Sequence, residues 1–414
     1  MKLSHNNNHL IRYFFRSYST PHHAKKSTSA RKLLGRPSNN LTSGIVGLAN
    51  VGKSTFFQAI TKSKLGNPAN YPFATIEPAE ARVVVPSSKL DHLADLYQSK
   101  KKIPSVLKIF DIAGLVRGAS DNKGLGNAFL ADIRAVDGIF QIVRAFRDEE
   151  ITHIEGNVDP VRDLTIVQDE LLLKDMEFIE NTTEKLTKQL RNTGGHQTLE
   201  AAKFKCELET LNIAYENLME GQRVRNKLDW TDEQIDALNA HTLLTAKPSV
   251  FLVNVNEQDY LSKSNEFLEG IQEWVDENAP GSAVILFSAD YETKLNEQDP
   301  DSTHETSALP LAIQEMRKSL NLISFYTCGP IEARQWTVRE QTACPQAAGV
   351  IHTDFEKTFI NAELIKYDDL RDLKPPFDEK LLRSKGKIQR VGKNYIVEDG
   401  DLLTFRAAAA KSKK

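Results

Sequence analysis

The sequence has few cysteines and no long apolar run, and each shortage argues against a class of protein. Its three cysteines lie far apart in 414 residues, which argues against a disulfide framework or a cysteine metal site and suits a reducing compartment. No apolar segment approaches the ~20 residues of a membrane-spanning helix. The net charge of -3 is not that of a global polycation that holds nucleic acid or membrane. The composition is that of an ordinary globular chain, long enough for two or three domains.

Acidic residues are missing from the first part of the chain. No Asp or Glu occurs before Glu77, whereas residues 1–40 contain eight Lys or Arg residues and six serines. A basic, serine-containing and acid-free start is typical of a mitochondrial presequence, and "RSYS" at 16–19 resembles a matrix-processing site with cleavage near Tyr18. We therefore predict localisation in the mitochondrial matrix and place residues 1–40 outside the fold. The alternative is a disordered basic tail.

Apolar runs and helical patterns alternate from residue 43 onward. Runs that end in polar loops predict an α/β domain with a mostly parallel sheet that is covered on both faces. The predicted strands are 43–48, 81–86, 106–113, 138–146, 249–255 and 282–289.

A long insert, about residues 157–240, separates the fourth and fifth of these strands. Apolar residues recur with 4-3 spacing from Leu172 to Leu190 and again from Phe204 to Leu218, and "RNTGGHQ" breaks the two runs. The pattern predicts an antiparallel helical arm. The arm is either a plain scaffold or a surface that docks a partner.

The chain becomes strand-rich again at about residue 322 and stays so to about residue 406. Its last part, "GKNYIVEDGDLLTF", predicts a hairpin that turns at Asp399-Gly400. Residues 407–414 form a tail that should fray. Five basic residues lie within 383–393; a solvated face is the default interpretation, and RNA contact is the alternative.

The segment "GLANVGKST" at 47–55 matches the phosphate-binding pattern G-x-x-x-x-G-K-[ST]. It follows a predicted strand and opens a predicted helix, which is the context that the pattern requires. Backbone N–H groups and the helix N-terminus would cradle the phosphates, Lys53 would reach the β- and γ-phosphates, and the Ser54 hydroxyl would ligate Mg²⁺. The residues predicted to bind nucleotide here are Asn50, Val51, Gly52, Lys53, Ser54 and Thr55.

Two further segments complete the predicted metal site. "DIAGL" at 111–115 follows a strand, so Asp111 is placed to hold Mg²⁺ through water, and the Gly114 N–H can sense a γ-phosphate. In "NYPFATIEP", Thr75 is the best candidate for a second Mg²⁺ hydroxyl. The predicted metal site therefore consists of Ser54, Thr75 and Asp111.

The order of "GLANVGKST", "NYPFATIEP", "DIAGLVRGAS", "GLGNAFLADIR", "NVNE" and "FSAD" resembles the Obg-like ATPase (YchF) family of P-loop NTPases. "AGVIHTDFEKTFINAELIKYDDL" resembles the TGS domain of that family, a ubiquitin-like β-grasp module. The resemblance implies an NTPase domain at 41–156 and 241–321, an arm at 157–240 and a TGS domain at 322–406. Together with the predicted presequence, it implies an ATP-hydrolysing regulator linked to mitochondrial translation, with the ribosome or RNA as a candidate partner of the arm and TGS domain. The sequence gives no indication of the oligomeric state.

The loop Asn254-Val255-Asn256-Glu257 occupies the place of a guanine-reading N-K-x-D loop. Guanine offers N1–H and N2–H₂ side by side to the short Asp carboxylate, but Glu257 is longer by one C–C bond, about 1.5 Å. Its carboxylate should miss that pair, which discards roughly 10⁴-fold discrimination. ATP is therefore the predicted substrate, as in family members with N-x-x-E, and a weak GTPase is the alternative. The predicted base-contacting residues are Asn254, Val255, Glu257, Ser288 and Ala289.

The predicted hydrolytic machinery departs from the common pattern. Leu115 stands where a Gln often orients the attacking water, and the His that the family is thought to use is replaced by Gln141, which cannot act as a base near neutral pH. A nucleotide-gated ribosome-binding module with negligible hydrolysis is therefore the alternative to an ATPase. Asn50 resembles the Asn that binds K⁺ in related enzymes, so K⁺ is a candidate second cofactor. The predicted catalytic residues are Lys53, Thr75, Gly114 and Gln141.

Overall fold

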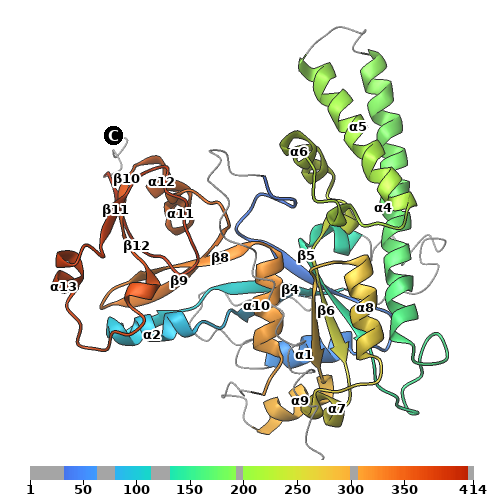
Figure 1. The fold of residues 1–414 in the computed structure, drawn as a ribbon, viewed down its shortest axis with the longest axis horizontal. Helices are drawn as coiled ribbons and strands as arrows, with labels where there is room; N and C mark the ends of the chain where they lie inside the picture. The colour runs from blue at the N-terminus through green and yellow to red at the C-terminus, as the bar shows by residue number, and fades with distance from the viewer. Residues whose placement is uncertain (1–31, 63–79, 113–130, 193–198, 299–305, 409–414) are drawn as a thin grey trace, which may run out of the picture. The chain divides into compact units, whose positions relative to one another are not determined.

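The computed structural model describes residues 32–62, 80–112, 131–192, 199–298 and 306–408, which contain two six-stranded sheets (Figure 1). Three residues of the predicted site, Thr75, Gly114 and Leu115, lie outside the described residues, as does the predicted presequence up to residue 31. None of the described helices has the length and apolar character needed to cross a membrane.

The first sheet is mostly parallel, as the alternating pattern predicts. Its strand order is β2-β4-β1-β5-β6-β7, and all neighbours run parallel except β2, which pairs antiparallel with β4. Every residue of β5 and β6 is buried, which explains their continuous apolar runs, because such strands are covered on both faces. The strands are β1 (Thr42–Val46), β2 (Glu80–Val84), β4 (Val106–Asp111), β5 (Gly138–Arg144), β6 (Ser249–Asn254) and β7 (Ala283–Phe287).

Helices pack on both faces of this sheet, and alternate residues of each strand contact the helices of one face or the other. On one face Phe56 of α1 (Lys53–Lys62) packs against Phe140 and Phe287, with ring centroids 5.9 and 5.3 Å apart. On the other face Val143 belongs to a cluster with Trp274 of α8 (Leu268–Asn278). Because side chains alternate along a strand, neighbouring β5 residues meet different helices. The other α-helices described between β6 and β8 are α7 (Glu257–Ser262), α9 (Ala289–Gln298) and α10 (Leu309–Ser319).

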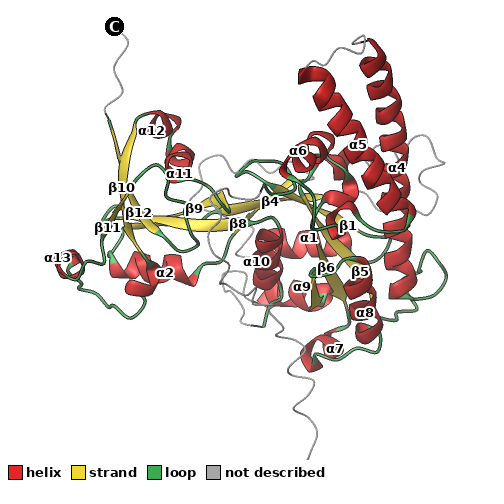
Figure 2. Ribbon diagram, turned by 45° about the horizontal axis from the view of Figure 1, so that its top comes forward, coloured by secondary structure: helices red, strands yellow, loops and turns green. Residues whose placement is uncertain are grey.

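The predicted arm is present as α4 (Pro160–Asn192) and α5 (Leu199–Met219), which lie side by side in Figure 2. Their contact includes Ile179 and Leu186 of α4 and Leu211 of α5, all at the predicted 4-3 spacing. α6 (Asp232–His241) packs on α5. The start of α4 also packs against the first sheet, since Leu164 belongs to the apolar cluster on the face that α8 covers. One helix thus joins the sheet to the arm.

The second sheet has the order β11-β10-β12-β8-β9-β3. α11 (Cys344–Ile351) packs on one face, where Ala347 joins Phe325 and Leu403 in a buried cluster. α12 (Thr353–Lys357) and α13 (Glu379–Ser384) are short. The strands are β3 (Lys101–Ile103), β8 (Leu322–Cys328), β9 (Glu332–Arg339), β10 (Phe359–Ile365), β11 (Gln389–Val391) and β12 (Leu402–Ala407).

Two predictions about this second sheet are wrong. The predicted terminal hairpin does not form, because β12 pairs with β10 and β8 while Ile396 makes only an isolated bridge to Ala343. Gly400, with φ +95°, turns the chain so that its N–H donates to Ser324 O. Residues 86–105 were assigned to the NTPase domain, but β3 pairs with β9, and α2 (Ser88–Leu96) packs in a cluster with Tyr326 and other C-terminal residues.

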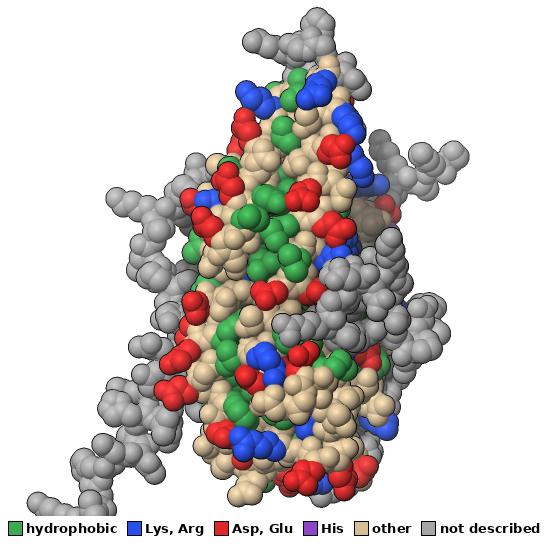
Figure 3. Space-filling model, turned by 90° about the vertical axis from the view of Figure 1, so that its right-hand side faces the viewer, with side chains coloured by type: hydrophobic (Ala, Val, Ile, Leu, Met, Phe, Trp, Pro, Cys, Tyr) green, Lys and Arg blue, Asp and Glu red, His purple; other side chains and the backbone are tan. Residues whose placement is uncertain are grey.

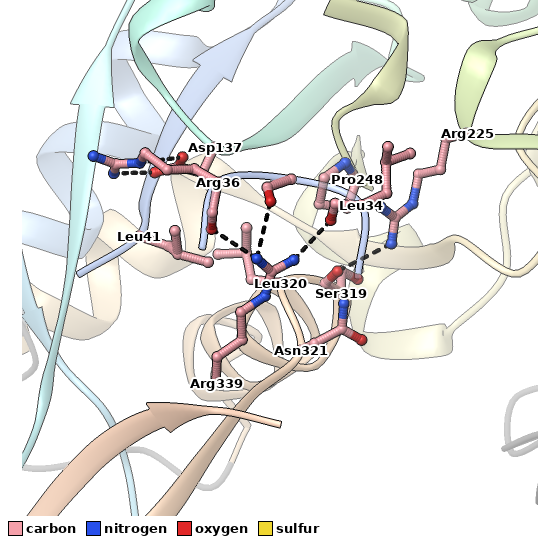
Figure 4. Close-up of a pocket in the computed structure, with 11 residues that line it drawn as sticks. Leu34, Arg36, Leu41, Asp137, Arg225, Pro248, Ser319, Leu320, Asn321 and Arg339 are labelled. Carbon is pink, nitrogen blue, oxygen red and sulfur yellow. Dashed lines mark hydrogen bonds and ion pairs between the residues drawn. The ribbon is translucent and has the colours of Figure 1, made fainter. Parts of the chain in front are cut away.

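Residues 33–40, here called the N-terminal strap, belong to the fold, contrary to the prediction that placed them outside it. Arg339 of β9 donates from Nη1 to Gly35 O (3.0 Å) and Arg36 O (2.7 Å), as Figure 4 shows. Asn239 Oδ1 of α6 accepts from Gly35 N at 2.6 Å, and Arg36 Nη2 lies 2.7 Å from Asp137 Oδ2. Arg339 is 9% exposed, and a buried guanidinium needs acceptors, which the strap carbonyls supply to its two Nη atoms.

Substituting Arg339→Met should lower the thermal midpoint of unfolding. The guanidinium lies under the strap, and its removal leaves strap carbonyls without their donor, at a cost of about 2 kcal/mol. Arg334→Met is the matched control, because Arg334 lies on the same strand but over the Trp336 ring, 4.0 Å from its centroid. Calorimetry should show a larger drop for Arg339→Met; equal midpoints for the two variants would contradict the role of the strap.

Candidate functional site

The loop between β1 and α1 depends on a glycine at Gly52. Its φ is +99°, a conformation that L side chains rarely adopt, and a Cβ there would collide with the Asn254 side-chain amide. Asn50 has φ +62°, which Asn tolerates better than most residues. The loop therefore keeps the shape of a phosphate-binding loop because of residue types that the pattern specifies.

Lys53 lies under this loop and is 7% exposed. Its Nζ donates to Leu48 O at 2.6 Å and to Gly47 O at 3.1 Å. Burial lowers the pKa of Lys53 to about 8, although Asp111 opposes that shift. Two carbonyl oxygens are weak partners for a buried cation, so phosphate oxygens would bind this ammonium more strongly.

The two described residues of the predicted metal site lie together. Ser54 Oγ is an exposed hydroxyl at the start of α1 and donates to Asp111 Oδ2, at the end of β4, over 3.3 Å. Burial raises the pKa of Asp111, while the Ser54 hydrogen bond and the Lys53 charge lower it. Hydroxyl and carboxylate oxygens suit Mg²⁺, which keeps several waters and takes its other ligands from substrate phosphates. This pair fits Mg²⁺, and Thr75 lies outside the described residues.

Asn254 connects the phosphate-binding loop to the loop after β7. Its Nδ2 donates to Val51 O at 3.0 Å, and its Oδ1 accepts from Ala289 N at 3.1 Å. The side chain is 3% exposed at the end of β6. Asn254 therefore holds the two loops together, and because its amide keeps a second N–H donor and a second acceptor lone pair, its contact with a base stays a prediction.

Three of the other predicted base contacts are buried. Val255 is 2% exposed and packs in a cluster with Ile271 and Val275, so its side chain faces the core and its predicted contact with the nucleotide would be through its backbone. Ser288 is fully buried, and its Oγ accepts from Tyr291 N at 3.4 Å, at the start of α9. Ala289 is also buried. These residues can meet a base only through their backbone.

Glu257 is exposed enough to meet a ligand but already has a partner. It is the first residue of α7, and its Oε2 accepts from Lys294 Nζ of α9 at 2.7 Å. Lys294 was missed by the sequence reasoning, because it lies in no motif and 37 residues from Glu257. The only local signal was its i,i+4 spacing to Asp290 on one helix.

Gln141 and Asn50, the two residues considered for water activation and K⁺ binding, differ in their exposure to solvent. Gln141 is 3% exposed on β5, and its neighbour Phe140 faces α1, so Gln141 faces away from α1. Its Nε2 has no hydrogen-bond partner among the described residues. Asn50 is exposed and donates from Nδ2 to Thr152 O at 3.1 Å. Thr55, also predicted to bind nucleotide, is exposed one residue beyond Ser54.

Comparisons with known proteins agree with this geometry. Residues 42–181 match the family "50S ribosome-binding GTPase", and residues 322–408 match the C-terminal domain of YchF GTPases, described as a protein of unknown function. The chain is 54% identical to the "Obg-like ATPase homolog" of Saccharomyces cerevisiae, over 92% of this chain and 98% of that protein. It is 50% identical to "Obg-like ATPase 1" of the same yeast, over 94% and 99%. A solved structure of the Schizosaccharomyces pombe YchF GTPase matches with a TM-score of 0.80 and 47% identity, over 90% of this chain and 100% of that chain.

The fold and the site define a P-loop nucleotide hydrolase with a C-terminal domain of the YchF type. Its P-loop domain is of a kind that generally uses Mg²⁺, which agrees with the Ser54 and Asp111 pair. The chain belongs to the Obg-like ATPase (YchF) family. The resemblance seen in the motifs is thereby confirmed over nearly the whole chain.

Substituting Lys53→Ala should lower the affinity for ATP by at least ~10-fold, or about 1.4 kcal/mol. The change removes the buried ammonium that faces the phosphate-binding loop. Lys62→Ala is the matched control, because Lys62 is exposed at the far end of the same helix. Titration calorimetry on folded protein is the measurement, and wild-type affinity in Lys53→Ala would refute the role.

Proposed function

We propose that this protein hydrolyses ATP to ADP and phosphate, in preference to GTP and with Mg²⁺, as a regulator linked to mitochondrial translation. The observation that carries the base preference is the partner of Glu257. A guanine-reading carboxylate directs both oxygens at N1–H and N2–H₂, whereas one oxygen of Glu257 is directed at the Lys294 ammonium of α9, 2.7 Å away. The relatives' names include both ATPases and a GTPase, so the preference rests on this contact and on the length of Glu257.

The described residues support phosphoryl transfer by positioning and charge. Ser54 and Asp111 would hold Mg²⁺, and bound Mg²⁺ would neutralise the charge that develops on the phosphate oxygens. Lys53 would move from its two backbone carbonyls to the phosphates, and the Gly52 backbone allows close approach. If K⁺ is used, Asn50 would offer it Oδ1, because its Nδ2 is bound to Thr152 O.

The second candidate function, a nucleotide-gated ribosome-binding module, is favoured by Gln141. A buried amide on the sheet face away from α1 cannot take a proton from water near neutral pH. The arm would supply the docking surface: Figure 3 shows apolar side chains along it, with acidic and basic residues beside them. Leu173, Leu199 and Met219 of its helices are more than half exposed. In either function the ribosome or RNA is the proposed partner.

Single-turnover hydrolysis separates the two candidates. We expect slow hydrolysis of ATP with Mg²⁺ and slower hydrolysis of GTP. A Gln141→His variant should gain little of the roughly 10²–10⁴-fold that a positioned general base contributes, because residue 141 lies on the sheet face away from α1. ATP affinity should change little, because Gln141 is buried away from the phosphate-binding loop. Gln141→Ala is the control for loss of the amide.

Three outcomes test these proposals: the first concerns the choice between the two functions, the second the substrate and the third Gln141. ATP turnover that is undetectable alone but present with mitochondrial ribosomes would favour the gated module. Faster GTP than ATP turnover would overturn the proposed substrate. Wild-type rates in both Gln141 variants would mean that Gln141 is structural.

Removal of residues 1–18 should leave the protein in the cytosol. The basic, acid-free start motivates a matrix address, and the deletion spares the N-terminal strap, so folding should be unaffected. Fractionation of cells expressing the truncated chain is the measurement. As a control, residues 1–40 fused ahead of a cytosolic reporter should carry it into mitochondria. Unchanged import of the truncated chain would defeat the proposal.

A further inference from the structure

Three charged side chains form a row beside the predicted base site, and no motif accounts for the middle one. Lys294 Nζ lies 2.7 Å from Glu257 Oε2 and 2.7 Å from Asp290 Oδ2. Asp290 and Lys294 are four residues apart on α9, a spacing that brings side chains together on a helix. Glu257 comes from α7, so the row, here called the charge triad, bridges two helices.

The helix that carries Lys294 is fixed on two sides. Glu292, 1% exposed, accepts from Ala308 N at 2.7 Å. Asn296 Nδ2 donates to Ala59 O of α1 at 2.8 Å. Because α1 begins at the phosphate-binding loop, these contacts hold the backbone of Lys294 in register with that loop.

The helix that carries Glu257 is fixed against α9. Tyr260 of α7 packs on Tyr291 of α9, with ring centroids 5.4 Å apart. The Asn256 side chain accepts from Asp259 N at 2.8 Å and so caps the start of α7. The contact between Glu257 and Lys294 therefore joins two positioned backbones, which sets it apart from an ordinary surface ion pair.

Lys294 stays charged in this setting. Its hydrogen bonds to Asp290 and then Glu257 raise the pKa of the ammonium above its ordinary value. An ammonium has three N–H donors, and two are directed at the carboxylates, which leaves one for an acceptor on a ligand. The triad thus offers a third N–H donor beside Glu257, and the ammonium, which it shares with Asp290, offsets part of the negative charge of that carboxylate.

The sign of the charge near base atom N1 distinguishes the two purines. Guanine N1 carries a hydrogen and is attracted by a carboxylate. Adenine N1 carries a lone pair and is attracted by a cation or a donor. A carboxylate alone therefore favours guanine, and the same carboxylate neutralised by an ammonium loses that preference or reverses it.

We propose that Lys294 is a specificity-determining residue, which selects adenine over guanine by offsetting the negative charge of Glu257 and presenting a donor to the base. This inference rests on the proposed preference for ATP and assigns its cause. Lys294 acts on the base and through Glu257; it has no part in holding phosphate or Mg²⁺. Its removal should therefore change which nucleotide binds while leaving the phosphate contacts intact.

The test is the ratio of dissociation constants for non-hydrolysable analogues of GTP and ATP, measured by calorimetry with Mg²⁺ on the full chain. In Lys294→Met the preference for the ATP analogue should fall by at least about threefold, the size expected of one exposed charged contact. Lys294→Arg keeps the cation and should keep the preference. Lys188→Met is the matched control, because Lys188 makes a 2.6 Å i,i+4 pair with Glu184 on the arm.

The outcomes separate this inference from the proposed function. If wild type prefers the ATP analogue and Lys294→Met keeps the wild-type ratio within threefold, the role of Lys294 is overturned while ATP preference stands. If wild type prefers the GTP analogue, ATP preference fails. The role of Lys294 then survives only if Lys294→Met shifts the ratio further toward GTP. An equal shift in Lys188→Met would show an unspecific charge effect and would also overturn the role.

Discussion

The arrangement of the nucleotide site depends on one buried amide. Asn254 donates to Val51 O and accepts from Ala289 N, so a single side chain holds the phosphate-binding loop and the start of α9 together. This contact also explains why residue 52 must be glycine, because any Cβ there would occupy the space of the amide. Since α9 carries Lys294, the proposed choice of base would be connected to the binding of phosphate through Asn254.

The second sheet is not built from C-terminal residues alone. β3 and α2 come from between β2 and β4 of the first sheet, yet they pair and pack with C-terminal strands. Arg317 of α10 strengthens this connection, because its guanidinium donates to Ser105 Oγ, Ser324 Oγ and Thr337 Oγ1. Displacement of β4, whose last residue is Asp111, would therefore strain both sheets.

Local motifs could be predicted from the sequence, and contacts between distant residues could not. The phosphate-binding loop, Asp111 and the parallel sheet follow from short patterns with a physical reason for each residue type. The loop motif places Val255 beside the base, but only the structure shows that its apolar side chain packs in the core. Lys294 meets Glu257 from 37 residues away, and no periodicity or spacing marks such a pair.

The N-terminal strap sets the order in which the chain can be completed during synthesis. Its residues leave the ribosome early, directly after residues 1–32, but Asn239, which accepts from Gly35, is made 204 residues later. Arg339 follows 304 residues after Gly35. This early segment is therefore among the last to find its partners, and loop closure over such distances is slow. A nascent chain that lacks β9 cannot form the contacts between Arg339 and the N-terminal strap. Completion of the fold therefore waits for synthesis of the C-terminal domain.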